Sequence, residues 1–275
     1  MSQIRQDVVD SDQVLMEFVV ATCNIRYAAD DAGNGWPMRL PLLSETIRKA
    51  APMILGTQEG WEWQLRELES ALGEYRIVDE NRYWMEERMY PCLFVAAGVE
   101  TARSGDVWLS QTPDRPGSRS FGSIYPRLMC WAEIELDQKR PVLFANLHLD
   151  HLSAETRSRQ IEVALTALSE IAAPEEPICL MGDFNDPPDG EVARTIIRHS
   201  GKLGLHFYDP WKQLDLPEVS SYHGFGTAEE SWSRIDWILL SDHFGCAGID
   251  LVRDAEPPLY PSDHYPVVAR VFLDQ

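Results

Sequence analysis

The chain has 275 residues, of which 44% are hydrophobic and 10% aromatic, as expected for a globular protein with a substantial core. Its 44 acidic residues outnumber 24 basic ones, giving a net charge of −20 at pH 7. Proteins that grip polynucleotides place lysine and arginine against phosphates, so this balance disfavours long nucleic acid as a partner. The polar N-terminus does not resemble a signal peptide, and no apolar run is long enough to span a bilayer. We therefore expect a cytoplasmic protein without membrane contact.

No linker or low-complexity segment divides the chain. We expect residues 1–13 to form a flexible segment and residues 14–275 a single catalytic domain. The five cysteines are an odd number and no two are close in sequence, which indicates free buried thiols in a reducing compartment.

The apolar pattern predicts strands and helices mixed along the chain. The first half begins with a strand, a helix, a strand and a helix at residues 16–22, 39–50, 53–58 and 61–72. Short strand-like runs follow at residues 92–97, 107–110, 128–136 and 141–147. The rest contains a long helix at 153–173, a strand at 178–181, a short helix at 191–199, and strands at 235–240, 247–252 and 265–272. This order indicates layered sheets covered by helices.

The most informative motif follows the strand at 178–181, where the chain reads Gly182-Asp183-Phe184-Asn185. Side chains alternate between the two faces of a strand, so Asp183 and Asn185 point the same way while Phe184 points into the protein. A carboxylate and an amide side by side at a strand end suit a metal ion and a phosphate.

Five other segments place polar, metal-capable side chains at the end of a probable strand. With the first motif, the set comprises Asn24, Glu59, His148, Asp183, Asn185, Asp236, Asp263 and His264. Oxygen ligands dominate and cysteine is absent from the set, which favours Mg²⁺, or Mn²⁺ in its place, over structural zinc.

These six segments, in this order, resemble the endonuclease/exonuclease/phosphatase superfamily over nearly the whole chain. The runs Leu109 to Ser118, Pro126-Arg127 and His223-Gly224-Phe225 are similar to its small bacterial branch. The resemblance implies an α+β fold, a four-layer α/β/β/α sandwich of two mixed β-sheets flanked by helices. It also implies a Mg²⁺-dependent phosphoric ester hydrolase with its site at one edge of the sandwich.

Carried over residue by residue, the resemblance makes Glu59 the principal metal ligand, with Asn24 and Asp263 beside it. Asp183 would orient or deprotonate the attacking water, and Asn185 and His148 would hold the phosphoryl oxygens. Asp236 would fix and polarise His264, because a carboxylate next to an imidazole favours its charged form.

Substrate contacts are less defined by the motifs. Arg26, Arg127 and Arg234 are placed as phosphate contacts with His223 beside them, although arginine also anchors loops through ordinary ion pairs. Further candidates for lining the pocket are aromatic and arginine residues, most of them in loops, namely Trp36, Arg82, Tyr83, Trp84, Arg88, Arg119, Tyr125 and Trp232. Tryptophan is more often a core residue, which is the alternative for these aromatics.

Phosphatases and nucleases share these catalytic residues, so the residues do not distinguish the two classes. The charge favours a phosphatase or phosphodiesterase acting on a small sugar phosphate, nucleotide or phosphorylated metabolite. The alternatives are a nuclease or deadenylase-like exonuclease on RNA or DNA, and a catalytically inactive binding module. A calcineurin-type metallophosphoesterase is disfavoured, because the Asp-x-His and Gly-Asn-His elements of that family are missing here.

Overall fold

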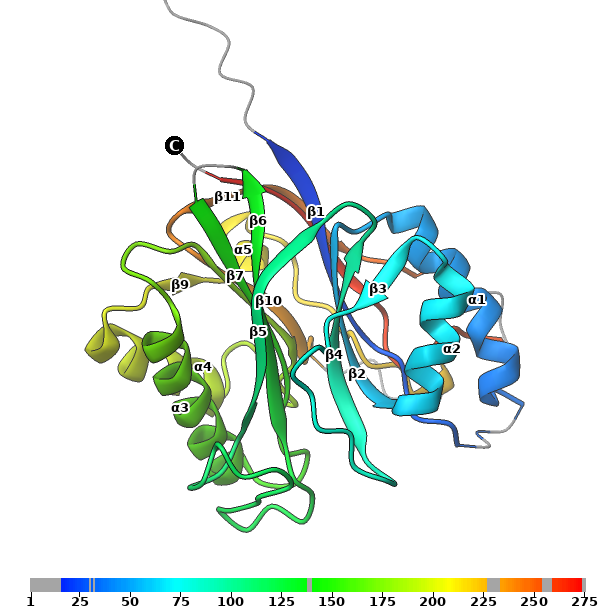
Figure 1. Ribbon diagram of the computed structural model, residues 1–275, viewed down its shortest axis with the longest axis horizontal. Helices are drawn as coiled ribbons and strands as arrows, with labels where there is room; N and C mark the ends of the chain where they lie inside the picture. Colours follow the sequence, from blue (N-terminus) through cyan, green and yellow to red (C-terminus); the bar gives the residue numbers. More distant parts are fainter. Residues whose placement is uncertain are drawn as a thin grey trace, which may run out of the picture.

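The computed structural model describes residues 16–29, 31, 33–137, 140–226, 233–253 and 259–273. Residues 1–13, expected to be flexible, and Trp232 lie outside the described residues. Two six-stranded sheets face each other at the centre of Figure 1, and helices cover the outer face of each. The predicted sandwich of two mixed sheets flanked by helices is confirmed.

The first sheet has the strand order β11-β12-β1-β2-β4-β3. Strands β1 and β2 run parallel, and the other pairs are antiparallel. The strands are β1 (Glu17–Asn24), β2 (Ile54–Trp61), β3 (Tyr75–Ile77), β4 (Met89–Ala96), β11 (Phe244–Leu251) and β12 (Val267–Leu273).

The second sheet has the strand order β5-β6-β7-β8-β10-β9, with β7 and β8 parallel. The other pairs in this sheet are antiparallel. Its strands are β5 (Glu100–Trp108), β6 (Leu128–Asp137), β7 (Arg140–His148), β8 (Ile178–Asp183), β9 (Phe207–Tyr208) and β10 (Asp236–Ser241).

Helices α1 (Trp36–Ala50) and α2 (Glu62–Leu72) cover the first sheet, and α3 (Ala154–Ile171) and α4 (Glu191–Ser200) cover the second. A short helix, α5 (Pro210–Gln213), follows β9. Helix α3 begins where the sequence indicated, because the Ser153 hydroxyl accepts a hydrogen bond from Thr156 N at 3.2 Å. None of the helices in the described residues is long and apolar enough to cross a membrane.

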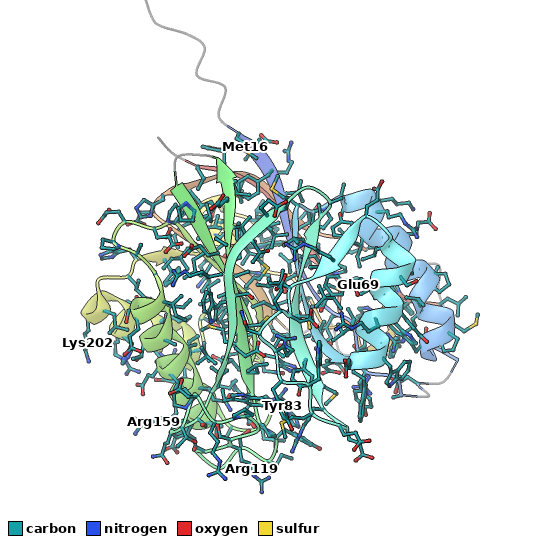
Figure 2. The ribbon with its side chains drawn as sticks, in the orientation of Figure 1. Met16, Glu69, Tyr83, Arg119, Arg159 and Lys202 are labelled. Atoms are coloured by element: carbon teal, nitrogen blue, oxygen red, sulfur yellow. The ribbon has the colours of Figure 1, made fainter. Side chains whose placement is uncertain are left out.

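The apolar core has three layers. The central layer lies between the sheets, where Phe18 and Ile54 of the first sheet meet Phe144, Met181 and Ile238 of the second. The outer layers join each sheet to its helices. Figure 2 shows the side chains that fill the space between the layers, with the labelled Arg159 and Lys202 at the periphery. A doubly packed sandwich of this kind holds its strand ends in fixed relative positions.

Several short elements were not predicted from the sequence. Strands β3 and β9 and helix α5 have between two and four residues, too few to show a period. Strand β5 starts at Glu100, whereas the sequence indicated only residues 107–110, because most of its first seven residues are polar and none is buried. Helix α1 begins at Trp36, before the predicted residue 39, since Pro37 suits the first turn of a helix.

The fold gathers the motif-bearing strand ends at one edge of the sandwich. In the first sheet Asn24 pairs with Gln58, so the ends of β1 and β2 lie side by side. In the second sheet Asp183 pairs with His148 on one side and with Asp236 on the other. A hydrogen bond from Asn24 to Asp183, 159 positions apart in the chain, joins the two sets of strand ends at one site.

Candidate active site

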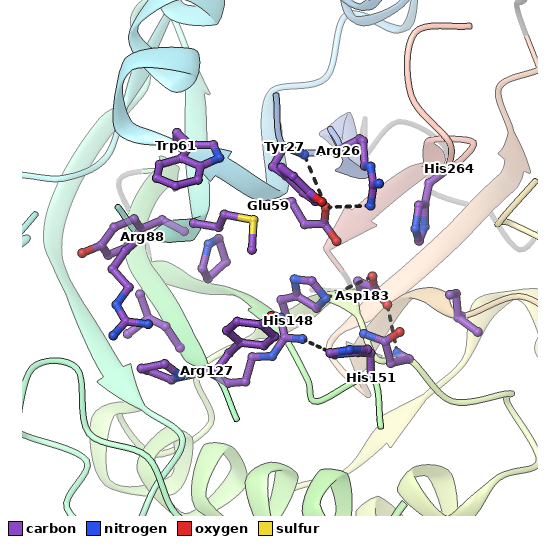
Figure 3. Close-up of a pocket in the computed structure, with 18 of the residues that line it drawn as sticks. Arg26, Tyr27, Glu59, Trp61, Arg88, Arg127, His148, His151, Asp183 and His264 are labelled. Carbon is purple, nitrogen blue, oxygen red and sulfur yellow. Dashed lines mark hydrogen bonds and ion pairs between the residues drawn. The ribbon is translucent and has the colours of Figure 1, made fainter. Parts of the chain in front are cut away.

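A cleft of about 690 Å³ opens at this edge of the sandwich. Figure 3 shows the side chains around it. The polar and aromatic side chains in its walls are Arg26, Tyr27, Glu59, Trp61, Glu87, Arg88, Tyr90, Trp108, Tyr125, Arg127, His148, His151, Asp183, Asn185, Tyr222, Asp263 and His264. Most of the residues singled out in the sequence motifs are thus brought together in one cavity.

Asp183 occupies the centre of the polar cluster. Its Oδ2 accepts a hydrogen bond from Asn24 Nδ2 at 3.0 Å and lies 3.4 Å from His148 Nε2. Its Oδ1 accepts from the backbone N–H of Asn185 at 2.9 Å. The side chain is almost fully buried at the floor of the cleft, so its charge is held among protein dipoles and not in water.

Asn185 reaches the cleft through a backbone conformation that side chains rarely adopt. Its φ of +50° turns the chain immediately after β8. In that position Asn185 Nδ2 donates to Leu149 O at 3.1 Å, which fixes the amide against the loop after β7. The Gly182-Asp183-Phe184-Asn185 motif therefore encodes a strand end and a turn that present two polar groups to one cavity.

Glu59 stands on a bulge of β2. The pairing of β2 with β4 shifts register between Thr57 and Gly60, and Glu59 has a φ of +65°. Its Oε1 accepts from Asn24 Nδ2 at 3.2 Å, and its Oε2 accepts from Tyr27 N at 3.3 Å. The bulge turns this carboxylate out of the ladder and into the cleft.

A buried polar contact between the two sheets supports this bulge. Asn146 of β7 donates through Nδ2 to Thr57 O at 2.8 Å and to Cys92 O at 2.9 Å. Its Oδ1 accepts from Gln58 Nε2 at 2.6 Å. Asn146, Thr57 and Gln58 are all fully buried. Backbone carbonyls freed by an irregular ladder are costly to bury unpaired, so Asn146 stabilises the bulge that carries Glu59.

Arg26 lies among three carboxylates at the first-sheet side of the cleft. It donates to both oxygens of Asp31, at 3.0 and 3.3 Å, and lies 3.9 Å from Glu59 Oε2 and 3.7 Å from Asp263 Oδ2. These carboxylates raise the pKa of Arg26 even though burial opposes its charge. Arg26 thus holds Glu59 and Asp263 near one positive centre.

Asp236 and His264 form a close, buried pair in the site. His264 Nδ1 lies 2.8 Å from Asp236 Oδ2, and the same oxygen accepts from Ser221 Oγ at 2.7 Å. Asp236 is fully buried behind the cleft wall, while His264 lines the cleft. The carboxylate fixes the ring orientation and leaves Nε2 as the nitrogen available to a ligand.

Charges in the site set three different protonation behaviours. Burial raises the pKa of Asp183 to about 7, with the charge of Asp236 adding to the rise and His264 opposing it. Burial acts to lower the pKa of His264, but the charge and hydrogen bond of Asp236 raise it to about 10. Burial, helped by the positive charges of Arg127 and His264, holds the pKa of His148 well below its usual range. Near neutral pH the site combines a charged imidazole, a neutral one and a carboxylate that titrates.

Arg127 lies below His148 in Figure 3 and contacts His151 through Nη2, 3.1 Å from the ring Nδ1. Its Nε is buried and lacks a hydrogen-bond partner among the described residues. His151 in turn stacks on Tyr125, with ring centroids 6.0 Å apart. An arginine in this position, without an ion pair to a described carboxylate, is suited to an anionic ligand.

Two expected substrate contacts lie elsewhere. Arg234 is fully buried away from the cleft, where it pairs with Asp209 at 2.7 Å and Glu218 at 3.3 Å and covers the ring of Trp211. His223 packs against the rings of Tyr260 and Tyr265, and burial lowers its pKa to about 4. The expectation of substrate contact is corrected for both: Arg234 is held away from the cleft by its ion pairs with Asp209 and Glu218, and His223 packs among aromatic rings beside the site.

Only some of the proposed loop residues line the cleft. Arg88 and Tyr125 do, whereas Trp36 is buried in the core and Arg82 pairs with Asp106 at 2.7 Å. The structure adds lining residues that were not predicted from the sequence, namely Tyr27, Trp61, Tyr90, Trp108 and Tyr222. The sequence pattern around these residues is weak, since each is one of many aromatic residues in this chain.

The donors around the cleft fit a hard divalent cation. Glu59 and Asp263 place carboxylates in the cavity wall, and the amide of Asn24 lies under Glu59. One ligand atom each from Asp183, Asp236 and His264 lie within 4.8 Å of one another. Such oxygen-rich sets suit Mg²⁺ or Mn²⁺. In the second group His264 Nδ1 and Asp236 are already bonded to each other, so the first set is the better match.

Comparison with known proteins identifies the family. Residues 21–264 match the profile of the Endonuclease/Exonuclease/phosphatase family. The chain belongs to this family. A comparison with curated protein sequences gave no match.

Solved structures of the same family share the fold. An endonuclease/exonuclease/phosphatase from Bacteroides vulgatus is 24% identical, with a TM-score of 0.81 over 94% of this chain and 100% of that chain. The mannosyl-6-phosphatase Bt3783 of Bacteroides thetaiotaomicron is 24% identical, with a TM-score of 0.77 over 93% and 100%. The catalytic domain of human nocturnin is 22% identical, with a TM-score of 0.71 over 95% and 97%. At these identities the likeness establishes the fold of the endonuclease/exonuclease/phosphatase family.

Proposed function

We propose that this family member is a divalent-metal-dependent phosphoester hydrolase that acts on a small phosphorylated metabolite, sugar phosphate or nucleotide. The observation that carries the proposal is the position of Asp183. It contacts Asn24 and His148 and pairs across β8 and β10 with Asp236, the partner of His264. Phosphoester hydrolysis needs an oriented water, stabilisation of the developing charge and help for the leaving oxygen, and these groups are suited to those tasks.

The roles follow from charge and position. Asp183 orients the attacking water and accepts its proton, because a base whose pKa is close to the working pH transfers protons most effectively. His264, kept charged by Asp236, donates to the phosphoryl group or to the leaving oxygen. Asn185 and neutral His148 orient the phosphoryl oxygens, and Arg127 balances their charge.

Glu59, Asn24 and Asp263 are the residues that would hold the cation. When bound, Mg²⁺ supplies positive charge to the phosphoryl oxygens as negative charge develops on them. Arg26 keeps Glu59 and Asp263 in place through its own contacts with them and with Asp31.

Two observations support a small substrate. The cleft volume of about 690 Å³ lies within the range of small-molecule sites. The chain carries a net charge of −20, and a long polyanion would have to approach that surface. The mannosyl-6-phosphatase among the structural neighbours is named for a reaction of this class, which agrees with the proposal.

The test is a side-by-side assay of phosphate release from sugar phosphates and nucleotides and of cleavage of labelled RNA and DNA. We expect phosphate release from at least one small ester, while the RNA and DNA remain uncleaved. Asp183→Asn should reduce the release at least about 100-fold, since it removes the proton acceptor. Asp189→Asn, on the exposed loop after the same motif, is the matched control and should retain wild-type activity.

Cleavage of polynucleotide in the absence of small-ester hydrolysis would replace the phosphatase proposal with the nuclease alternative. Such an activity would lose affinity steeply as salt rises, because phosphate contacts release counterions. Hydrolysis that survives Asp183→Asn would remove Asp183 from the catalytic role.

A further inference from the structure

The cleft extends beyond the polar cluster into an aromatic arm. We define this arm by Trp61, Arg88, Tyr90, Pro91 and Trp108, which line the cleft from β2, β4, β5 and the turn before β4. In Figure 3, Trp61 and Arg88 lie on one side of the cavity and Asp183 and His264 on the other. If the phosphoryl group binds at Asp183, the alcohol portion of the ester therefore lies in the aromatic arm.

Arg88 is unusual among the cleft arginines. Arg26 is balanced by Asp31, Glu59 and Asp263, and Arg127 contacts His151 next to the polar cluster. Arg88 is half-buried, and it makes neither an ion pair nor a hydrogen bond with the described residues. A half-buried guanidinium without a counter-charge loses hydration that an anion would restore.

The surroundings of Arg88 hold it in the arm. Met85 N donates to Tyr90 Oη at 2.7 Å, which ties the turn before Arg88 to β4. Glu87 has a φ of +53° and turns the chain just before Arg88. Tyr90 is itself packed edge-on against Trp84 and Trp108, with centroids 4.8 and 6.5 Å apart. Its hydroxyl already accepts a hydrogen bond from Met85, so the wall beside Arg88 presents mainly ring surface.

We propose that the aromatic arm is a second subsite, which binds the alcohol portion of the substrate through an additional anionic group paired with Arg88. The substrate class is thus a phosphoester whose body carries a second phosphate or a carboxylate, with a sugar or base face against the rings. The inference rests on the proposed hydrolase function and specifies its substrate.

Matched esters test the subsite. Glucose 6-phosphate carries one anionic group, 6-phosphogluconate adds a carboxylate, and glucose 1,6-bisphosphate adds a phosphate. Adenosine 5′-monophosphate and adenosine 3′,5′-bisphosphate repeat the comparison with a nucleoside in place of the sugar. The readout is the ratio of kcat/KM between the doubly and singly anionic member of each pair. We expect at least one ratio to exceed about tenfold, the size of one charge-assisted hydrogen bond.

Three variants distinguish a specific pairing of the anion with Arg88 from an effect of the protein's net charge. Arg88→Gln should bring the preferred ratio close to one. Arg115→Gln makes the same change in net charge on an exposed loop outside the cleft and should leave the ratio unchanged. Glu87→Gln removes a negative charge from the same wall and should keep or raise the ratio. Comparison of the carboxylate and phosphate esters identifies which anion Arg88 selects.

Calorimetric titration of the same compounds in EDTA gives a second readout that does not depend on turnover. Weaker binding of the doubly anionic compounds to Arg88→Gln, relative to Arg115→Gln, supports the subsite even if no ester is hydrolysed. Equal ratios for wild type and Arg88→Gln in both assays would overturn it, while phosphate release in Mg²⁺ would still support the hydrolase function.

Discussion

Histidine shows how position determines chemistry at the residue scale. His148, His223 and His264 lie close together, and burial acts to lower the pKa of each. His264 Nδ1 lies 2.8 Å from the buried carboxylate of Asp236, and the pKa of His264 is raised to about 10, whereas His148 Nε2 lies farther, at 3.4 Å, from Asp183. The same ring is therefore an acid at one position and a neutral dipole at the next.

Asp236→Asn tests this assignment. The substitution keeps the shape and removes the charge that favours the His264 imidazolium, so the pKa of His264 should fall. We expect kcat to drop by about 10²- to 10⁴-fold, as for other proton-transfer groups. An NMR titration of His264 and steady-state kinetics give the two readouts. Asp242→Asn, exposed after β10, is the control, and an unchanged His264 pKa in Asp236→Asn would refute the assignment.

At the scale of the elements, the site depends on irregular backbone at strand ends. Glu59, Gly182 and Asn185 all have positive φ: the first two lie near the ends of β2 and β8, and Asn185 follows β8. Regular strands would alternate their side chains between the two faces of each sheet and would not aim these groups into one cleft. Strained residues of this kind persist because the surrounding packing and hydrogen bonds hold them.

Gly182 is the position where this requirement is sharpest. Its φ is +142°, and an added Cβ would lie 2.1 Å from the backbone oxygen of Leu147 on β7. Gly182→Ala should therefore separate β7 from β8 and lower the free energy of unfolding by about 3 kcal/mol, measured by urea denaturation. Gly201→Ala is the control: its Cβ meets open space and its φ is −60°. A Gly182→Ala variant as stable as Gly201→Ala would show that β7 and β8 accommodate the added Cβ without a loss of stability, which would contradict the prediction.

The long elements were predictable from the sequence, and the irregular ones were not. Helix α3 has a clear apolar period and a hydroxyl cap, and strands β6 and β8 are short runs rich in apolar residues, so the predicted bounds were close to the observed ones. The β2 bulge has no local signature, because it depends on Asn146 of the other sheet. The burial of Arg234 also depends on Asp209 and Glu218, residues that only the folded chain brings near.

For the whole molecule, the excess of acidic residues limits which substrates can approach. The chain carries 44 acidic and 24 basic residues, and the cleft itself places three arginines beside the carboxylates of Glu59, Glu87, Asp183 and Asp263. A small anion needs only the local arginines, whereas a polymer would also meet the acidic surroundings. The motifs predicted the catalytic groups because their residue types are chemically restrictive. They did not predict the aromatic arm, since aromatic residues serve the core equally well.

Metal-dependent phosphate release tests the central claim most directly. Protein treated with EDTA would be assayed on a hydrolysed ester while Mg²⁺ is added back, beside Glu59→Gln and the control Glu62→Gln, exposed in the first turn of α2. We predict no release without metal, recovery with Mg²⁺, and a much higher Mg²⁺ requirement for Glu59→Gln alone. Release that persists in EDTA, or a Glu59→Gln variant identical to Glu62→Gln, would contradict the account.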